Sequence, residues 1–235
     1  MRVVIVKQSA IMALVPARAG SKGVPNKNLA DLGGRPLIEW TIQAVRRSET
    51  KIRLVVTTDS RAIATLARAL GAEVVMRPKS LAGDESPTEP ALLHALTDVG
   101  ASASDTVLML QPTSPFRRRG TIDRAIDEYM TEECDSVVGV VPESPFLWTG
   151  PAERPTPHYT LEARRRRQDL NTGDLVYREP GSLYVCSVAG LKSSGNRLHG
   201  RIRLFEMAVV EGHDIDTPQD LEVAQGICIR EWESM

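Results

Sequence analysis

The sequence predicts a single α/β domain built around a mainly parallel sheet. Apolar runs rich in β-branched residues recur along the chain, and all but the last precede a segment with helical spacing. Such near-continuous apolarity indicates strands that are covered on both faces. Strand followed by helix, repeated, is typical of a parallel α/β sheet. A chain of 235 residues with 42% hydrophobic residues is long enough for one sizeable core.

The predicted strands of this sheet are the apolar runs at 11–17, 52–59, 105–111 and 135–141. The helices between them are predicted from apolar residues that recur at the spacing of one buried helical face. The residues on these faces are Ile63, Leu66 and Leu70, then Leu92, Leu96 and Val99, and then Ile122, Ile126 and Tyr129.

Further strands and a helix are predicted towards the C-terminus. Short strands cover 182–188 and 201–210. The helix opens in 217-TPQD-220, which has the spacing of a capping box and a proline at the first helical position. Its predicted buried face carries Leu221, Ala224 and Cys228.

The segment from about 142 to 181 interrupts this pattern. It is rich in proline, arginine and glycine and has no helical period. Compact domains rarely keep loops longer than about 12–15 residues without a function. We therefore expect an insertion that closes over a site or makes a subunit contact. The predicted domain spans 1–235, with this insertion at about 142–181.

The charge balance argues against nucleic acid and membranes as partners. The chain has 29 basic and 30 acidic side chains and a net charge of −1, so it has no overall attraction to polyanions. The run Arg164–Arg167 lacks the interleaved aromatic residues of a nucleic-acid surface, and a solvated charged face is an open explanation for it. No apolar run approaches the ~18 residues of a membrane span.

Cysteine usage points to the cytoplasm. Cys134, Cys186 and Cys228 are widely separated and odd in number. This pattern fits neither a disulfide framework nor the spacing of zinc ligands. We therefore expect the protein in a reducing, cytoplasmic environment.

The segment 16-PARAGSKGVPNKN-28 follows the first predicted strand, where the ligand crevice of a parallel α/β sheet lies. Gly20 and Gly23 allow backbone N–H groups to approach an anion. Positive charge comes from Arg18, Lys22 and Lys27. The spacing is neither that of a Walker A loop nor that of G-x-G-x-x-G. The chemistry predicts a phosphate-binding loop, while a solvated turn with surface lysines stays open.

Asp214 and Asp216 form the second candidate site. In an extended chain, residues two positions apart point to one side, about 6.5–7 Å apart along the strand. Hard carboxylate oxygens suit Mg²⁺. From the spacing alone an alternative is equally open, namely that Asp216 or Thr217 caps the helix that begins at Pro218.

These motifs together resemble the signature of a known family. The segments 16–28 and 33-GGRPLIEWTI-42 look like those of the nonulosonate cytidylyltransferases, the family of the CMP-N-acetylneuraminate (CMP-sialic acid) synthetases. Further matches along almost the whole chain are 58-TDS-60, 77-RPKSLAGDESPT-88, 110-LQPTSPFRR-118, 166-RRQDL-170, 182-SLYV-185 and 213-HDIDTPQDL-221. The resemblance implies a Rossmann-like nucleotidyltransferase (GT-A-like) fold with three α/β/α layers.

The resemblance also implies a reaction and its nucleotide. In this family the anomeric hydroxyl of a 2-keto sugar acid attacks the α-phosphate of CTP and gives the CMP-sugar and pyrophosphate. The residues at matching positions are Arg18, Ser21, Lys22 and Lys27 for the phosphates, and Asn28 with the loop residues Arg77 and Thr88 for the cytidine. Asp214 and Asp216 match the metal site, which implies Mg²⁺ or Mn²⁺. The implied catalytic residues are Arg18, Lys22 and Asp216.

The resemblance leaves the acceptor more open than the nucleotide. The residues at positions that face the sugar acid are Gln111, Arg167, Arg178 and Tyr184. Two departures fall on this side. Pro180-Gly181 stands where the family often has Asn-Gly, and Leu147 stands where sialic-acid enzymes tend to carry a lysine.

The candidate acceptors are therefore sialic, legionaminic or pseudaminic acid, a deaminated nonulosonate or an eight-carbon ketosugar acid. A catalytically silent nucleotide-binding module is the alternative from a different class. The family is commonly dimeric through an insertion at the place of 142–181, which implies a homodimer.

Overall fold

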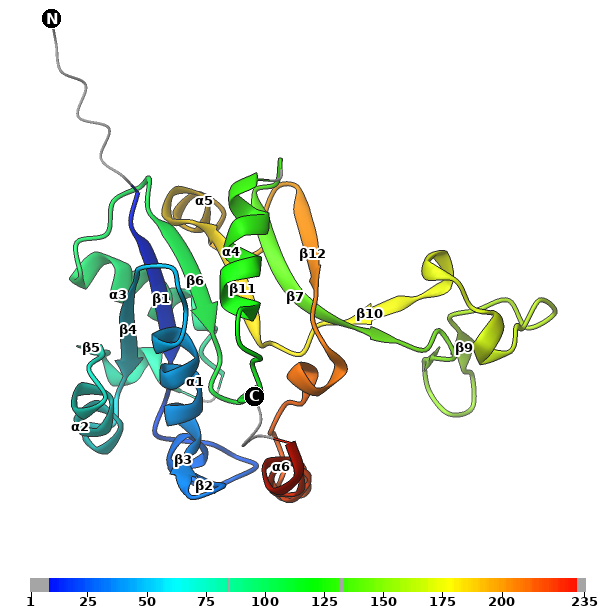
Figure 1. The fold of residues 1–235 in the computed structure, drawn as a ribbon, viewed down its shortest axis with the longest axis horizontal. Coiled ribbons are helices and arrows are strands. Elements are labelled where there is room, and N and C mark those ends of the chain that lie inside the picture. Colours follow the sequence, from blue (N-terminus) through cyan, green and yellow to red (C-terminus); the bar gives the residue numbers. More distant parts are fainter. Residues whose placement is uncertain (1–8, 84, 132, 232–235) are drawn as a thin grey trace, which may run out of the picture.

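A sheet of eight strands forms the centre of the fold in the part of the chain that the structure describes (Figure 1). The computed structural model describes residues 9–83, 85–131 and 133–231. The strand order is β10-β7-β11-β6-β1-β4-β5, and β12 also pairs with β7. The strands are β1 (Ile11–Pro16), β4 (Ile52–Thr58), β5 (Glu73–Met76), β6 (Thr106–Leu110), β7 (Ser136–Glu143), β10 (Val176–Arg178), β11 (Leu183–Ser187) and β12 (Ile202–Glu206), with small hairpins of β2 (Asp31–Leu32) and β3 (Arg35–Pro36) and of β8 (Trp148–Thr149) and β9 (Thr156–Pro157).

The parallel part of the sheet consists of β1, β4, β5 and β6. This confirms the prediction of a mainly parallel α/β sheet. β11 runs antiparallel to both β6 and β7, and β12 runs parallel to β7. The strand predicted over 201–210 ends earlier than expected, at Glu206, and a short 3₁₀ helix follows at Val209–Gly212.

Helices cover both faces of the sheet. Successive residues of β1 alternate between two apolar clusters, so these clusters lie on opposite faces. One cluster contains Ile63 and Ile122 with other residues of α1, α2 and α4, and the other contains Leu92 with residues of α5. The predicted three layers are thus present. The helices are α1 (Leu37–Arg46), α2 (Arg61–Ala69), α3 (Thr88–Asp98), α4 (Thr121–Thr131), α5 (Val188–Ser194) and α6 (Pro218–Glu231).

The last helix, α6, packs at the carboxyl edge of the sheet beside the β2–β3 hairpin (Figure 1). Ala224 and Cys228 on its predicted face are buried together with Leu32 of the hairpin. The predicted capping box is present. Thr217 Oγ1 accepts a hydrogen bond from the backbone N–H of Asp220 (3.2 Å), and Asp220 Oδ2 accepts one from the backbone N–H of Thr217 (2.8 Å).

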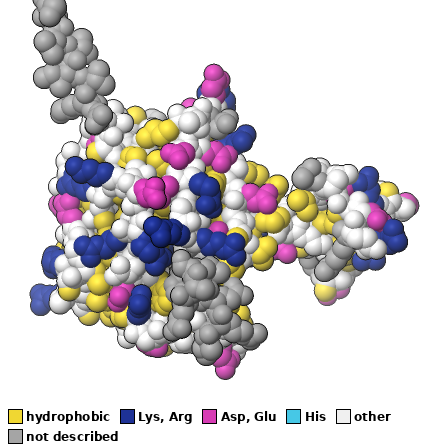
Figure 2. Space-filling model, in the orientation of Figure 1, with side chains coloured by type: hydrophobic (Ala, Val, Ile, Leu, Met, Phe, Trp, Pro, Cys, Tyr) yellow, Lys and Arg dark blue, Asp and Glu magenta, His cyan; other side chains and the backbone are white. Residues whose placement is uncertain are grey.

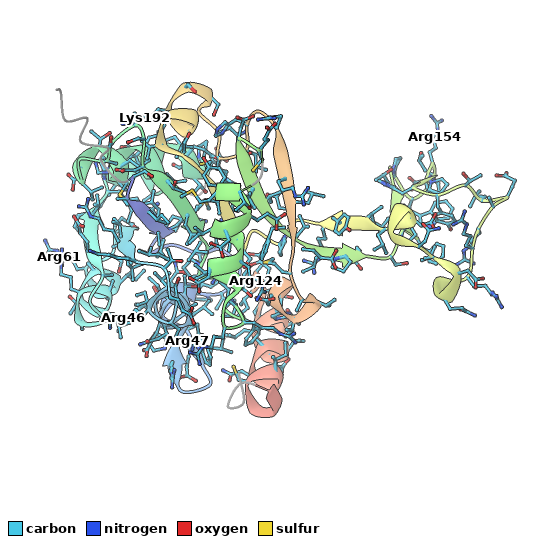
Figure 3. The ribbon with its side chains drawn as sticks, turned by 45° about the horizontal axis from the view of Figure 1, so that its top comes forward. Arg46, Arg47, Arg61, Arg124, Arg154 and Lys192 are labelled. Atoms are coloured by element: carbon cyan, nitrogen blue, oxygen red, sulfur yellow. The ribbon has the colours of Figure 1, made fainter. Side chains whose placement is uncertain are left out.

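The segment predicted as an insertion forms a projecting arm. β7 runs to Glu143 and β10 begins at Val176, and the chain between them leaves the edge of the sheet (Figure 1). We call residues 144–175 the arm. It holds the β8–β9 hairpin and short 3₁₀ turns. Arg154, labelled in Figure 3, lies on the arm well away from the sheet.

Basic and acidic side chains are interspersed on the face of the molecule shown in Figure 2, over both the body and the arm. This distribution agrees with the net charge of −1. Large apolar side chains are also exposed on the arm, namely Leu147, Trp148 and Leu161. Within the described residues, no helix combines the length and the apolar composition that crossing a membrane requires.

Candidate active site

A cavity of about 460 Å³ opens at the carboxyl edge of the parallel strands. Its wall includes Pro16, Arg77 and Gln111, which lie at or directly after the ends of β1, β5 and β6. The predicted site residues on this wall are Arg18, Ser21, Lys22, Lys27, Asn28, Arg77, Thr88, Gln111, Asp214 and Asp216. The structure therefore brings the predicted nucleotide and metal residues to one cavity, and their contacts with a ligand stay predictions.

The loop after β1 is held in shape by its own hydrogen bonds. The side-chain amide of Asn28, a buried residue, donates to the carbonyl oxygen of Arg18 (2.9 Å). The backbone N–H of Ala19 donates to Asp59 Oδ1 (2.9 Å). Asn26 has a left-handed backbone (φ 50°), a conformation that asparagine tolerates better than most residues. In the structure Asn28 shapes the loop, and its predicted contact with cytidine stays a prediction.

Gly23 is required by a close approach of two chain segments. A Cβ at this position would lie 1.9 Å from the carbonyl oxygen of Asp216, far inside any real contact. We expected Gly20 and Gly23 to admit an anion. A Cβ on Gly20 would meet no atom within 4 Å, whereas Gly23 lets the loop touch the segment that carries the carboxylates. The predicted phosphate-binding loop and the carboxylate pair are thus packed against each other.

The segment 213–216 presents both carboxylates to the cavity. Ile215 between them is fully buried, so the residues on either side of it face away from the core. This is the arrangement expected for two residues that are two positions apart in an extended chain. The alternative that Asp216 or Thr217 caps α6 holds for Thr217, which forms the capping box with Asp220. The side chain of Asp216 instead accepts a hydrogen bond at Oδ1 from Lys27 Nζ (2.8 Å).

The electrostatics of the pair fit a divalent cation. Burial raises the pKa of Asp214, and hydrogen bonds from Thr113 and Ser114 oppose this while the charge of Asp216 adds to it. A cation beside both carboxylates would offset their repulsion. No group of three or more histidine, cysteine or acidic side chains is arranged to hold a metal in the described part of the chain. The pair would therefore share a cation with ligand oxygens, as Mg²⁺ commonly does.

Arg77 adds a largely buried positive charge to the cavity wall. Burial lowers the pKa of Arg77, Asp59 acts against this, and the charge of Arg18 lowers the pKa further. Two guanidinium groups that repel each other favour an anion between them. Thr88, expected on a loop, is instead the first residue of α3. The amino end of a helix therefore also lies at the cavity, and its partial positive charge favours an anionic ligand.

Gln111 is the one residue predicted to face the sugar acid that lies on the described cavity wall. A Cβ on Gly181 would lie 2.3 Å from Gln111 Oε1. Gly181 also has a φ of 76°, in the left-handed region that favours glycine. The Pro180-Gly181 turn is therefore packed against the side chain of Gln111.

The other three residues predicted to face the sugar acid do not belong to the described cavity wall. Arg178 on β10 donates to Glu143 Oε2 (3.2 Å) and to the carbonyl oxygen of Gly212 (3.1 Å). Tyr184 is buried, and its hydroxyl donates to Glu179. The side chain of Arg167 lies outside the described residues. The contacts of these three side chains with a substrate stay predictions.

The rest of the arginine run makes contacts within the arm. The contacts are Arg164 Cζ over the ring of Phe146 (4.7 Å), Arg165 with Asp174 (2.6 Å) and Arg166 with Asp169 (2.6 Å). The two ion pairs balance charge inside the arm, and the guanidinium of Arg164 packs on an aromatic ring. We infer that this part of the run stabilises the arm rather than forming an open basic surface.

Arg117 supports the site from behind the cavity wall, a role that the sequence does not predict. It is fully buried, and its guanidinium donates to Thr41 Oγ1 (3.0 Å) and to the carbonyl oxygens of Gln111 (2.8 Å) and Ser182 (2.6 Å). Burial lowers the pKa of Arg117 to about 10, while Glu211 and Asp214 act in the opposite direction. The side chain therefore stays charged at neutral pH and ties together α1, the loop after β6 and the start of β11.

These features define the class of the protein. The carboxyl edge of the parallel sheet carries a cationic, glycine-containing loop and a pair of carboxylates. This arrangement is typical of nucleotide-binding α/β proteins. Residues 12–147 match the sequence model of the family described as Cytidylyltransferase. Because this match covers more than half of the chain, the protein belongs to the cytidylyltransferase family.

Relatives and solved structures agree with this assignment. The chain is 34% identical over 218 residues to the CMP-N,N'-diacetyllegionaminic acid synthase of Legionella pneumophila, covering 89% of this chain and 92% of that protein. It is 40% identical over 131 residues to the N-acylneuraminate cytidylyltransferase of Escherichia coli, covering 55% of this chain and 31% of that protein. These names confirm the predicted family.

The relatives differ in how much of their own length this chain covers. The chain spans about half the length of other N-acylneuraminate cytidylyltransferases that it matches, including the Streptococcus agalactiae proteins. In structure it resembles CMP:2-keto-3-deoxy-manno-octonic acid synthetase complexed with CTP, with a TM-score of 0.72, 18% identity, and coverage of 95% of this chain and 100% of that chain. This likeness confirms the predicted nucleotidyltransferase fold.

Proposed function

We propose that the protein activates a nine-carbon 2-keto sugar acid, an N-acylneuraminate or a related nonulosonate, with CTP. The observation that carries the proposal is the cavity in which the 16–28 loop packs against the segment of Asp214 and Asp216. The family assignment and the names of the relatives support the nucleotide and the class of acceptor. The free thiols of the three cysteines support a cytoplasmic location.

The proposed reaction is a nucleotidyl transfer. The anomeric hydroxyl oxygen of the acceptor forms a bond to the α-phosphorus of CTP, the bond between the α-phosphorus and the bridging oxygen breaks, and pyrophosphate leaves. The hydroxyl proton goes to solvent. Such a reaction depends mainly on positioning and on offsetting phosphate charge. The side chains that would offset this charge are Arg18, Lys22 and Lys27.

The proposed cation is Mg²⁺ or Mn²⁺, held by Asp214 and Asp216 together with phosphate oxygens. When bound, it supplies Lewis-acid stabilisation of the charge at the reacting phosphate. Asp214 is oriented by hydroxyl groups, with Ser114 Oγ 3.4 Å from its Oδ1. Asp216 lies nearer to solvent, with its side chain 71% exposed. The two carboxylates thus differ in their exposure to solvent and in the charge of their hydrogen-bond partners.

The acceptor is proposed to lie beside Gln111 and the Pro180-Gly181 turn. Gln111 lies on the same wall as the nucleotide residues. Gly181 packs against the side chain of Gln111. The Pro180-Gly181 turn, where the family often has Asn-Gly, therefore shapes this end of the cavity. We propose Arg167, Arg178 and Tyr184 as further acceptor residues from the resemblance.

The experiment that tests the function is pyrophosphate release from CTP and Mg²⁺ across a panel of 2-keto sugar acids. The panel contains N-acetylneuraminic, legionaminic, pseudaminic, deaminated nonulosonic and eight-carbon acids. We expect release with at least one nine-carbon acid and with CTP in preference to ATP, GTP and UTP. CTP binding without release for any acid would favour the catalytically silent nucleotide-binding module and defeat the proposal.

We further propose a homodimer whose contact includes the arm. The arm projects from the body (Figure 1). It exposes Trp148 and Leu161. At the sheet edge beside it, β12 exposes Ile202 and Leu204. Contiguous exposed apolar surface is typical of subunit contacts, and we propose that these side chains contribute to one. Sedimentation velocity of the full chain at micromolar concentration is expected to give a dimer, and a monomer under these conditions would contradict the proposal.

A further inference from the structure

Lys27 is bonded to the segment that carries the metal-site carboxylates. Its Nζ donates to Asp216 Oδ1 and to the carbonyl oxygen of Ile215, both at 2.8 Å. The Lys27 side chain is 12% exposed. In the structure the Lys27 ammonium therefore lies against the carboxylate of Asp216.

The backbone around Lys27 explains why the ammonium is placed there. Lys27 begins a 3₁₀ helix that follows the left-handed Asn26, and the next residue, Asn28, is tied to the carbonyl oxygen of Arg18. Gly23 of the same loop touches the backbone of Asp216. The loop and the carboxylate segment are thus joined at two points, one at the backbone and one through the Lys27 ammonium.

The two carboxylates have partners of different charge. Asp214 is bonded by the hydroxyl groups of Thr113 and Ser114, which are neutral and can rotate. Asp216 is bonded by the positive charge of Lys27. A divalent cation that binds both carboxylates meets neutral hydrogen-bond donors at Asp214, where Lys27 acts through its charge alone. At Asp216 it must displace the hydrogen-bonded ammonium of Lys27.

A triphosphate would change this competition. Lys27 lies on the wall of the cavity together with Arg18 and Lys22, where the proposed function places the phosphates. Phosphate oxygens offer the ammonium a partner with more negative charge than a single carboxylate. An ammonium group that turns towards the phosphates leaves Asp216 to the cation, and the phosphates supply further oxygen ligands for it.

We propose that Lys27 is a positioning residue that makes cation binding at Asp214 and Asp216 depend on the nucleotide. In the nucleotide-free protein its ammonium pairs with Asp216 and weakens the site for a divalent cation. A bound triphosphate takes up this ammonium and so strengthens the site. The inference rests on the proposed function only in taking a triphosphate as the ligand, because its first test uses the metal alone.

The test is Mn²⁺ binding to the full chain without nucleotide, measured by the loss of the free-ion electron paramagnetic resonance signal. Lys27→Met is expected to bind Mn²⁺ about fivefold more tightly than the natural protein, because it removes a partly exposed ion pair. Lys27→Arg keeps the charge and is expected to behave as the natural protein. Asp216→Asn is expected to lose the gain when combined with Lys27→Met.

Lys22→Met is the matched control, because it removes one positive charge from the same loop and the same cavity. General loss of positive charge would tighten Mn²⁺ binding equally in Lys22→Met and Lys27→Met, and that result would overturn the proposal. Saturable binding by Lys27→Met that is no tighter than that of the natural protein would overturn it as well. Circular dichroism checks that each variant is folded.

A second experiment adds CTP without acceptor, so that no turnover occurs. The natural protein is expected to gain more Mn²⁺ affinity from CTP than Lys27→Met does. An equal gain in both proteins would overturn the nucleotide dependence. Failure of the natural protein to bind CTP would instead defeat the proposed function, and the comparison with Mn²⁺ alone would still test the pairing of Lys27 with Asp216.

Discussion

Replacing Arg117 with methionine is expected to lower the free energy of unfolding by about 3–5 kcal/mol. Methionine fills much of the same volume but donates no hydrogen bonds. The carbonyl oxygens of Gln111 and Ser182 would lose a charged donor in a buried place. The buried carboxylate of Glu211 would also lose its favourable charge interaction with Arg117.

The same substitution is expected to affect the acceptor more than the nucleotide. Arg117 holds the backbone of Gln111, on the cavity wall, and of Ser182, the residue after the Pro180-Gly181 turn that packs against Gln111. Loosening these segments is expected to raise the KM for the sugar acid several-fold more than the KM for CTP. Urea denaturation gives the stability, and steady-state pyrophosphate release with each substrate varied in turn gives the two KM values.

Arg124→Met is the matched control for this prediction. Arg124 is exposed on α4 (Figure 3) and donates one hydrogen bond, to Thr121 Oγ1 (3.1 Å). Its loss is expected to cost about 0.5 kcal/mol. If Arg117→Met does not fold, Thr41→Val removes one of the three partners of Arg117 and is expected to cost about 1 kcal/mol. Equal stability losses in Arg117→Met and Arg124→Met would contradict the role given to Arg117.

The sequence predicts those strands whose apolar residues follow directly from burial on both faces of the sheet. The strands β1 and β6 are apolar along most of their length because both of their faces are buried. The edge strand β5 is different. It has four residues, of which only Val75 is buried, so the run is too short to stand out. β10 was hidden for the same reason, inside a segment without a visible period.

The candidate site divides in a similar way. Charge and spacing single out the residues of the 16–28 loop and of 214–216, and these residues line one cavity. For the two aspartates the spacing alone leaves a metal site and a helix cap equally open, and the resemblance favours the metal. Arg117 begins a run of three arginines, which by composition reads as exposed surface. Only the packing of α1, β6 and β11 around it shows that it is buried. Gly23 was predicted for its freedom to admit an anion, but its contact with Asp216 depends on a segment far away in the sequence.

Replacing Asp216 with asparagine is expected to lower the rate of pyrophosphate release by about 10²–10³-fold, equivalent to about 3–4 kcal/mol in the transition state. Asparagine keeps the shape of the side chain but removes the negative charge. The proposed cation would lose one of its two carboxylates, and Lys27 would lose its ion-pair partner. We therefore expect a lower kcat at saturating Mg²⁺ and a higher Mg²⁺ concentration for half the maximal rate.

The fold is expected to withstand this substitution. The Asp216 side chain is 71% exposed, and the capping box of Thr217 and Asp220 holds the start of α6 independently of it. Exposed substitutions of this kind change the free energy of unfolding by about 0.5 kcal/mol or less. Glu222→Gln, which removes the same charge from an exposed position on α6, is the control and is expected to keep full activity. Unchanged turnover in Asp216→Asn would show that the carboxylate pair does not hold the reacting metal, because Lys27 alone cannot replace a divalent cation at the phosphates.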